Sequence, residues 1–182
     1  GNYLTIIDKV KDIIGMAFGS TQAGIGNLIA SHDVNHSLEV YWELFDSRMA
    51  ISTSILLVIA FITEPFIAVW LSPKYLLGGS VLVLTVFNSW LYINRVTTDS
   101  FISGFGLYQD IWAPIVEAII NFSVAVILGK FYGISGVLMG TIISTLIIIY
   151  LWKPYMLFTR GFKRPALKSY FLKSVGRWII AG

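Results

Sequence analysis

Residues 131–152 read FYGISGVLMGTIISTLIIIYLW and contain 22 consecutive positions without a charged side chain. A helix of this length crosses a hydrocarbon core about 30 Å thick, because each residue adds about 1.5 Å. Seven of the chain's 13 Lys and Arg residues follow between Lys153 and Arg177, and no acidic residue occurs after Glu117. Since cations mark the cytoplasmic end of a span, this stretch indicates an integral membrane protein with residues 158–173 inside the cell.

The composition agrees with a membrane protein. The chain is 56% hydrophobic and only 13% charged, whereas soluble domains are about 25% charged. Its net charge of +3 comes from the basic cluster near the C-terminus, which favours an anionic membrane surface over nucleic acid as the partner. No cysteine is present, so disulfides and Cys-based metal sites are excluded. His32 and His36 are interpreted as surface residues, and no metal or other cofactor is expected.

Hydropathy and spacing predict an all-α fold, a polytopic transmembrane helix bundle. Residues 1–182 form a single transmembrane domain, interpreted as a fragment of a larger protein because both ends lie in helix-like sequence. The five expected spans cover about 3–30, 49–71, 77–103, 111–130 and 134–157, and a truncated sixth begins near 167. Short connections predict antiparallel neighbours, and Glu64-Pro65 is expected to interrupt the second span.

The segment 34–48 is predicted to be a separate helix lying on the membrane surface. Its apolar residues fall on one stripe, with acidic residues elsewhere, and Asp33 is the expected N-cap. The stripe contains Val34, Leu38, Tyr41 and Phe45.

Small residues recur at the spacing that lets membrane helices approach closely. The pairs are Gly15 and Gly19, Gly129 and Gly133, and Gly136 and Gly140. Helix packing is the expected role of these glycines.

The third span carries the best candidate site. Four polar residues are predicted to share one face: Asn88, Tyr92, Arg95 and Asp99. The opposite face is expected to be apolar, with Val86, Leu91 and Ile93. A charged residue at a helix centre costs at least about 2.5–3.5 kcal/mol, so Arg95 needs a partner or a wet cavity. Two interpretations remain open: a neutralising Arg95–Asp99 pair, or a face that lines a hydrophilic cavity.

The fourth span adds Glu117 and Asn121, four residues apart. Glu117 lies too deep in the span to be obviously interfacial. It takes part either in ion or proton coupling or in an interhelical hydrogen bond as a neutral acid. No nucleophile motif, phosphate-cradling loop or metal-ligand set accompanies these residues, so the protein is not expected to be an enzyme.

Five short phrases occur in an order and spacing that resemble a known family. They are GIGNLIA at 24–30, PFIAVWL at 65–71, WAPIVEAIIN at 112–121, GISGV at 133–137 and WKPY at 152–155. This pattern resembles bacterial polysaccharide transporters, the O-antigen and capsule flippases of the multidrug/oligosaccharidyl-lipid/polysaccharide exporter superfamily. The resemblance implies a two-lobe exporter of 12 to 14 helices, of which this chain would be most of the second lobe.

The resemblance also implies a function. Such transporters move undecaprenyl-diphosphate-linked oligosaccharide repeat units across the cytoplasmic membrane, by alternating access, for polysaccharide biosynthesis and export. The implied partners are the lipid-linked oligosaccharide, membrane lipids, and a repeat-unit polymerase with its glycosyltransferases; the implied location is the bacterial inner membrane. The resemblance also implies a cationic residue in the cavity that holds the diphosphate or acidic sugars of the substrate, and in this chain that residue would be Arg95. Two alternatives stay open: a drug/cation antiporter of the same superfamily, and a membrane-embedded sugar transferase or ligase.

Overall fold

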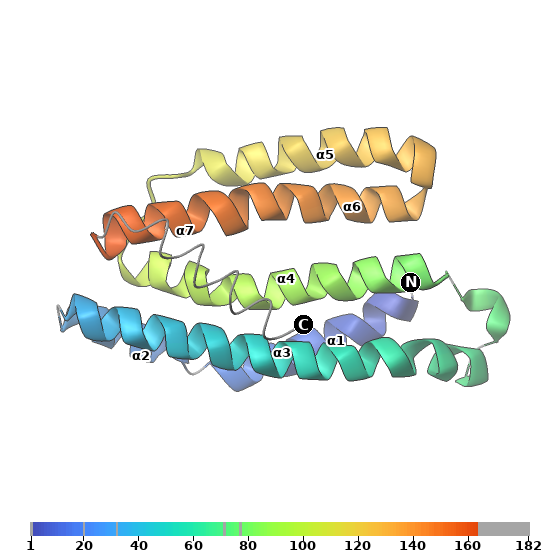
Figure 1. Ribbon diagram of the computed structural model, residues 1–182, viewed down its shortest axis with the longest axis horizontal. Helices are drawn as coiled ribbons and strands as arrows, with labels where there is room; N and C mark the ends of the chain where they lie inside the picture. Colours follow the sequence, from blue (N-terminus) through green and yellow to red (C-terminus); the bar gives the residue numbers. More distant parts are fainter. Residues whose placement is uncertain (1, 20, 32, 71, 77, 164–182) are drawn as a thin grey trace.

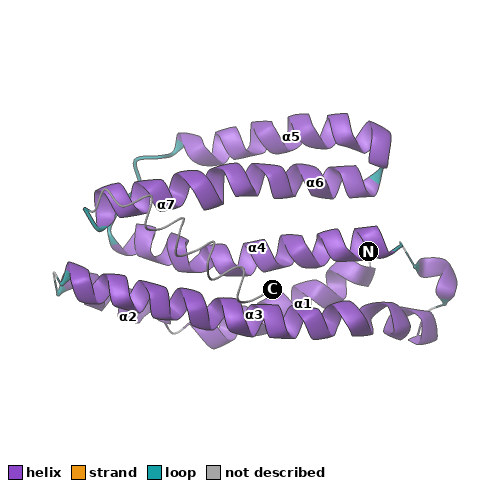
Figure 2. Ribbon diagram, in the orientation of Figure 1, coloured by secondary structure: helices purple, strands orange, loops and turns teal. Residues whose placement is uncertain are grey.

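The computed structural model describes residues 2–19, 21–31, 33–70, 72–76 and 78–163, which form helices joined by short loops (Figures 1 and 2). The helices are α1 (Asn2–Gly19), α2 (Thr21–Ala30), α3 (Val34–Trp70), the 3-10 turn Pro73–Tyr75, α4 (Gly79–Gly104), α5 (Trp112–Tyr132) and α6 (Ile134–Thr145). Helical structure continues from α6 through a π-helical segment (Leu146–Trp152), α7 (Lys153–Met156) and a second π-helical segment (Leu157–Gly161). The predicted segment beginning near 167 lies outside the described residues.

The long helices lie roughly parallel to one another and alternate in direction (Figure 1). The α2–α3 and α4–α5 connections and the end of α7 gather at one end of the bundle. The α3–α4 and α5–α6 connections gather at the other end. This arrangement agrees with the antiparallel neighbours that the short connections predict.

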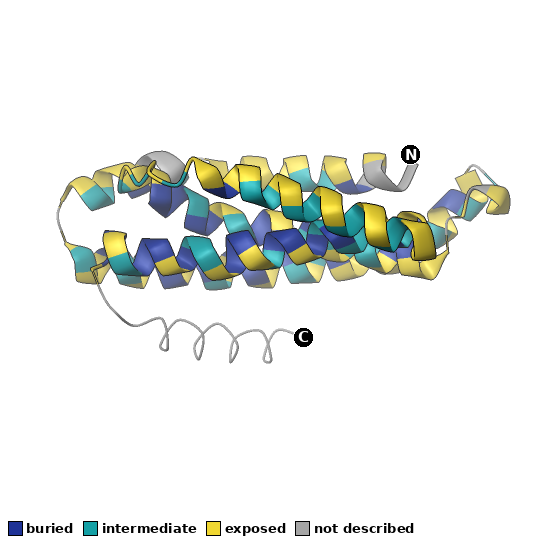
Figure 3. Cartoon of the chain, turned by 90° about the horizontal axis from the view of Figure 1, so that it is seen from above, coloured by how far each residue is buried: buried dark blue, intermediate teal, exposed yellow. Residues whose placement is uncertain are grey.

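Three described helical stretches are long and apolar enough to cross a membrane: Val34–Trp70, Trp112–Tyr132 and Ile134–Gly161. Many residues of these helices are exposed, as the yellow segments in Figure 3 show. They include large apolar residues such as Phe61, 78% exposed, and Phe122, 73% exposed. Water-soluble monomers rarely expose so much contiguous apolar surface. The all-α membrane-bundle fold is therefore confirmed. The helices α1 and α4, at two further predicted spans, carry more charged or polar residues.

The structure corrects the separate surface helix predicted at 34–48. Residues 34–70 form one continuous helix, and it passes through Pro65 without ending. The stripe expected to face the membrane is instead buried inside the protein: Tyr41 and Phe45 are 0% and 2% exposed, and pack with Phe101 and Phe162. The sequence shows that this stripe is apolar but does not show whether lipid or protein covers it. The predicted N-cap is confirmed, because the Asp33 carboxylate accepts a hydrogen bond from the His36 backbone N–H at 2.9 Å.

Helices α5 and α6 form a tight hairpin because small residues let their backbones meet. A Cβ added to Gly136 would lie 2.1 Å from the Leu128 carbonyl oxygen, and one added to Gly140 would lie 2.7 Å from the Ala125 nitrogen. Gly133 turns the chain between them with a φ of 58°, a left-handed conformation that favours glycine. Packing is confirmed here, whereas Gly15 and Gly19 meet no described atom within 4 Å of an added Cβ.

Helix α4 lies at the centre of the bundle and is buried on more than one side. Ile93 packs with Ile14 and Leu56, on the side of α1 and α3. Leu91, expected on the same apolar face, instead packs with Ile142 and other residues of the α5–α6 side. The predicted division of α4 into one polar and one apolar face is therefore wrong, because neighbouring helices cover it from both sides.

Candidate functional site

Four charged side chains meet between α4, α5 and the start of α7. The Arg95 Nε donates to Asp99 Oδ2 at 3.0 Å, and the Lys153 Nζ donates to Asp99 Oδ1 at 2.6 Å. The Arg95 Nη1 lies 3.9 Å from Glu117 Oε1. Cations and carboxylates therefore alternate along the series Glu117, Arg95, Asp99, Lys153, which we call the charge cluster. The net charge of the charge cluster is zero, because it contains two cations and two carboxylates.

Local structure explains how these side chains converge. Arg95 and Asp99 are one helical turn apart on α4, so both project toward the same neighbours. Lys153 follows the π-helical segment Leu146–Trp152, and its backbone N–H bonds to the Ile148 carbonyl, five residues back. Pro154 lacks an N–H, so the ordinary bond to the Tyr150 carbonyl is absent and the wider turn is favoured. In this turn the Tyr150 hydroxyl donates to the Leu91 carbonyl at 2.8 Å, which ties the segment to α4.

The charge cluster is partly buried. Its side chains are between 16% and 30% exposed, with Lys153 the most buried and Asp99 the least. Ions at such sites lose much of their hydration. The free energy lost in this way must be recovered from their ionic partners and the remaining water. Asp99 is the centre of the arrangement because it accepts from both cations. The sequence expectation of an Arg95–Asp99 pair is confirmed, and the structure adds Glu117 and Lys153 to it.

Helix α4 ends at Gly104, at the end of the bundle that holds the α4–α5 connection (Figure 1). Asp99 is five residues from the end of α4 and Arg95 is nine, which corresponds to depths of roughly 7 and 13 Å along the helix. Arg95 is thus too deep to be a simple surface residue but is still within reach of the interface.

The remaining predicted site residues are arranged differently. Asn88 donates its side-chain amide to the Leu84 and Leu138 carbonyl oxygens, at 3.1 and 3.2 Å, and so connects α4 to α6. Tyr92 is 55% exposed and lies under the Lys11 ammonium, 5.1 Å from its ring centroid. Asn121 is partly buried one turn beyond Glu117 on α5. The structure brings together Arg95, Asp99 and Glu117, and the Tyr92 ring borders both Arg95, whose guanidinium carbon is 5.9 Å from its centroid, and Lys11 of α1. Asn88 serves helix packing.

Sequence reasoning missed Lys153 as a site residue. It was counted with the basic cluster that marks the cytoplasmic end, where a lysine is ordinary. Nothing in the local pattern separates a lysine that reaches into the bundle from one that reaches lipid headgroups. The adjacent Pro154 was the available signal, because a proline inside a helix often marks a local irregularity.

Neutral polar side chains connect α4 to α3 on the other side. The Trp90 indole N–H donates to Thr53 Oγ1 at 2.8 Å, and the Asn94 amide donates to Ser52 Oγ at 3.0 Å. The Tyr41 hydroxyl and Thr98 Oγ1 are 3.1 Å apart. These contacts are typical of membrane helices, where polar side chains bond across the interface. Charges therefore connect α4 to α5 and α7, while neutral hydrogen bonds connect it to α3.

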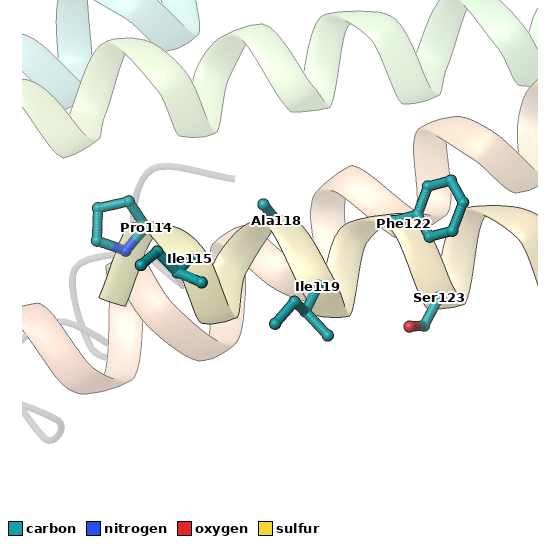
Figure 4. A pocket seen from close by; sticks show the side chains of 6 residues that line it. All are labelled: Pro114, Ile115, Ala118, Ile119, Phe122 and Ser123. Atoms are coloured by element: carbon teal, nitrogen blue, oxygen red, sulfur yellow. The ribbon is translucent and has the colours of Figure 1, made fainter. Parts of the chain in front are cut away.

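Helix α5 presents an apolar surface away from the charge cluster. A shallow hollow there is lined by Pro114, Ile115, Ala118, Ile119, Phe122 and Ser123, as Figure 4 shows. All six residues are exposed. Such a surface suits lipid chains and offers no charged group to a polar ligand.

Within the described ranges, no group of three or more His, Asp or Glu side chains is placed to hold a metal ion. A scan against protein-family models gave no match, and searches of curated proteins and of solved structures gave none either. The geometry of the bundle and its charged residues therefore carry the functional argument.

Proposed function

We propose that this chain is part of a transporter that moves a lipid-linked oligosaccharide across a bacterial cytoplasmic membrane. The observation that carries the proposal is the charge cluster, a partly exposed set of ionic groups inside helices that otherwise expose apolar surface. Ionisable residues at membrane depth commonly mark substrate or ion pathways. The five phrases that resemble polysaccharide flippases supply the substrate class.

In the proposed mechanism the charge cluster acts as a latch, which means that its ion pairs hold two groups of helices together in one conformation and break when the helices move apart. Glu117 and Lys153 belong to the α5–α7 side, whereas Arg95 and Asp99 belong to α4. Rocking of one group against the other separates both cross-helix pairs while the Arg95–Asp99 pair within α4 persists. Transporters that work by alternating access use such rigid-body movements. When Glu117 withdraws, the Arg95 guanidinium has free donors for an anionic part of the substrate, such as a diphosphate or an acidic sugar.

A drug/cation antiporter is the alternative from the same superfamily. It needs a carboxylate that is free to bind a cationic drug or a coupling cation. Both carboxylates of the charge cluster already lie beside Arg95 or Lys153. The same pairs occupy both cations, so the preference for an anionic substrate rests on the five phrases that resemble polysaccharide flippases. A membrane-embedded sugar transferase is less well supported, because the connections between the described helices are short.

The test is complementation of polysaccharide export in a strain that lacks its flippase, using a gene for the whole transporter of which this chain is proposed to be part. We expect export to be restored by the wild type and abolished by Arg95→Ala, with similar amounts of protein in the membrane. Arg160→Ala is the matched control, because Arg160 contacts Gln109 outside the charge cluster. Failure of the wild type to restore export, together with a gain of drug resistance, would replace the flippase with the antiporter.

A further inference from the structure

A second cationic site lies between α1, α3 and α4, next to the charge cluster: its Tyr92 ring has its centroid 5.9 Å from the Arg95 guanidinium carbon. A cavity of about 160 Å³ opens between α1, α3 and α4, and its lining includes Lys11, Phe18, Arg48, Tyr92 and Ser100. This volume is far above the roughly 10–15 Å³ that one water requires. The cavity therefore has room for a polyatomic ion.

Arg48 is the unusual group in this cavity. Its side chain is only 4% exposed, and its Nε has no hydrogen-bond partner among the described residues. No described carboxylate forms an ion pair with it, in contrast to Arg95. Its closest compensation is the Phe18 ring, whose centroid lies 4.5 Å from the guanidinium carbon. A cation–π contact offsets only a fraction of the hydration that a buried guanidinium loses.

Lys11 supplies a second cation at the mouth of the cavity. Its side chain is 25% exposed and forms an ion pair with Asp8 at 2.5 Å. The half-exposed Tyr92 ring lies beneath its ammonium. With Arg48, Lys11 and Asp8 counted together, the cavity carries one uncompensated positive charge. An anion that enters past Lys11 and Tyr92 would meet both cations.

The position of Arg48 along α3 indicates where such an anion would come from. Arg48 is 22 residues from Trp70, the end of α3, which corresponds to roughly 33 Å of helix. This length is close to one hydrocarbon thickness of about 30 Å. The cavity neighbours of Arg48 include Val96 and Ser100, which are eight and four residues from the end of α4, a depth similar to that of Arg95 and Asp99, so Arg48 lies below the headgroups but within reach of them.

We propose that this cavity binds one phosphate-type oxyanion, held by Arg48 with Lys11 as the second cation. The guanidinium offers several donors in a planar fork, which matches the geometry of phosphate oxygens. Inorganic phosphate and the headgroup phosphate of an anionic lipid share this chemistry. The cavity lining includes none of the four residues of the charge cluster, although Tyr92 borders both sites. The proposal does not depend on which substrate the protein transports.

The main experiment measures thermal unfolding of the purified full chain with inorganic phosphate or with chloride at equal ionic strength. At ten times the Kd, phosphate should raise the Tm by about 3–6 °C relative to chloride. Arg48→Met should lose this shift. Arg160→Met, which removes a cation outside the cavity, should keep it.

A second arm identifies the source of the oxyanion. The chain is placed in phosphate-free nanodiscs of phosphatidylcholine, with or without added phosphatidylglycerol. Stabilisation by phosphatidylglycerol that disappears in Arg48→Met supports the site and assigns it to a lipid headgroup. Stabilisation by inorganic phosphate alone supports the site with a free anion. Absence of both effects in the wild type, or their persistence in Arg48→Met, overturns the proposal.

If Arg48→Met does not fold, two variants at the mouth of the cavity test the oxyanion site in its place. Lys11→Met removes a charged donor and should weaken phosphate binding roughly tenfold. Asp8→Asn removes the competing carboxylate and should tighten binding, because the Lys11 ammonium becomes available. Unchanged phosphate affinity in both variants would show that Lys11 and its cavity are not the site.

Discussion

Arg95 and Arg48 are two arginines on neighbouring helices whose surroundings differ sharply. Arg95 is about a quarter exposed and lies beside two carboxylates, Asp99 and Glu117. Arg48 is almost fully buried, and among the described residues only an aromatic ring compensates it. The comparison shows that burial and neutralisation are separate properties of a membrane arginine. It also explains why we assign the two residues different roles: Arg95 binds an anion only after its carboxylate partner withdraws, whereas Arg48 has no carboxylate among the described residues to release.

The largest effect is expected for Asp99→Asn. This change removes the shared acceptor of Arg95 and Lys153 and leaves two cations close together with only Glu117 nearby. Breaking a buried ion pair costs about 3–5 kcal/mol, and partial exposure reduces this to about 3 kcal/mol. The measurement is the unfolding temperature of the purified protein, which should fall by roughly 6–12 °C. A fall of the same size in Asp33→Asn, a change at an exposed carboxylate, would show that the charge cluster has no special stability.

The next largest effect is expected for exchanging Arg95 and Asp99. If they formed an isolated pair, the exchange would be neutral. The structure places the incoming cation beside Lys153 and the incoming carboxylate beside Glu117, so two repulsive contacts form. We expect a loss of about 2 kcal/mol, measured by denaturant or thermal unfolding. Reversing Glu117 and Lys153 as well restores the alternation and should recover most of the loss; no recovery would argue against a coupled cluster.

Replacing each of the two arginines with methionine compares their contributions to stability directly. Arg95→Met leaves Glu117 without its nearest cation and should destabilise the protein by about 1–2 kcal/mol. In phosphate-free buffer with neutral lipid, Arg48→Met leaves no carboxylate behind and removes a buried cation. It should therefore be neutral or stabilising, as hydrophobic replacements of buried ions often are. Thermal unfolding of the two variants side by side measures the difference, and equal destabilisation would contradict the distinction drawn here.

The smallest effect is expected for Asn88→Leu. Its amide donates to the Leu138 carbonyl of α6 and contacts no member of the charge cluster. Interhelical hydrogen bonds in membrane proteins contribute about 0.6 kcal/mol on average, so a similar loss is expected. In the export assay this variant should retain most of the wild-type activity. An inactive but stably inserted Asn88→Leu protein would return Asn88 to the site.

Particular elements show which features the sequence predicts well. The apolar runs at 111–130 and 134–157 correspond closely to α5 and to the helical stretch from α6 through α7, because hydrophobic length is a local property. The close approach at Gly136 and Gly140 followed from small residues at helix spacing. The predicted boundary between 48 and 49 was wrong, because a change from polar to apolar sequence does not end a helix.

The sequence by itself determined that the chain is an all-α membrane protein, where α5 and the helical stretch from α6 through α7 lie, and that Arg95 and Asp99 are neighbours. These features depend on local hydropathy and on residues one turn apart. Only the tertiary structure decided that Lys153 pairs with Asp99, that Glu117 lies beside Arg95, and that Arg48 lines a cavity. Such contacts join residues as many as 54 positions apart. They depend on how the helices are rotated and packed, which no local pattern specifies.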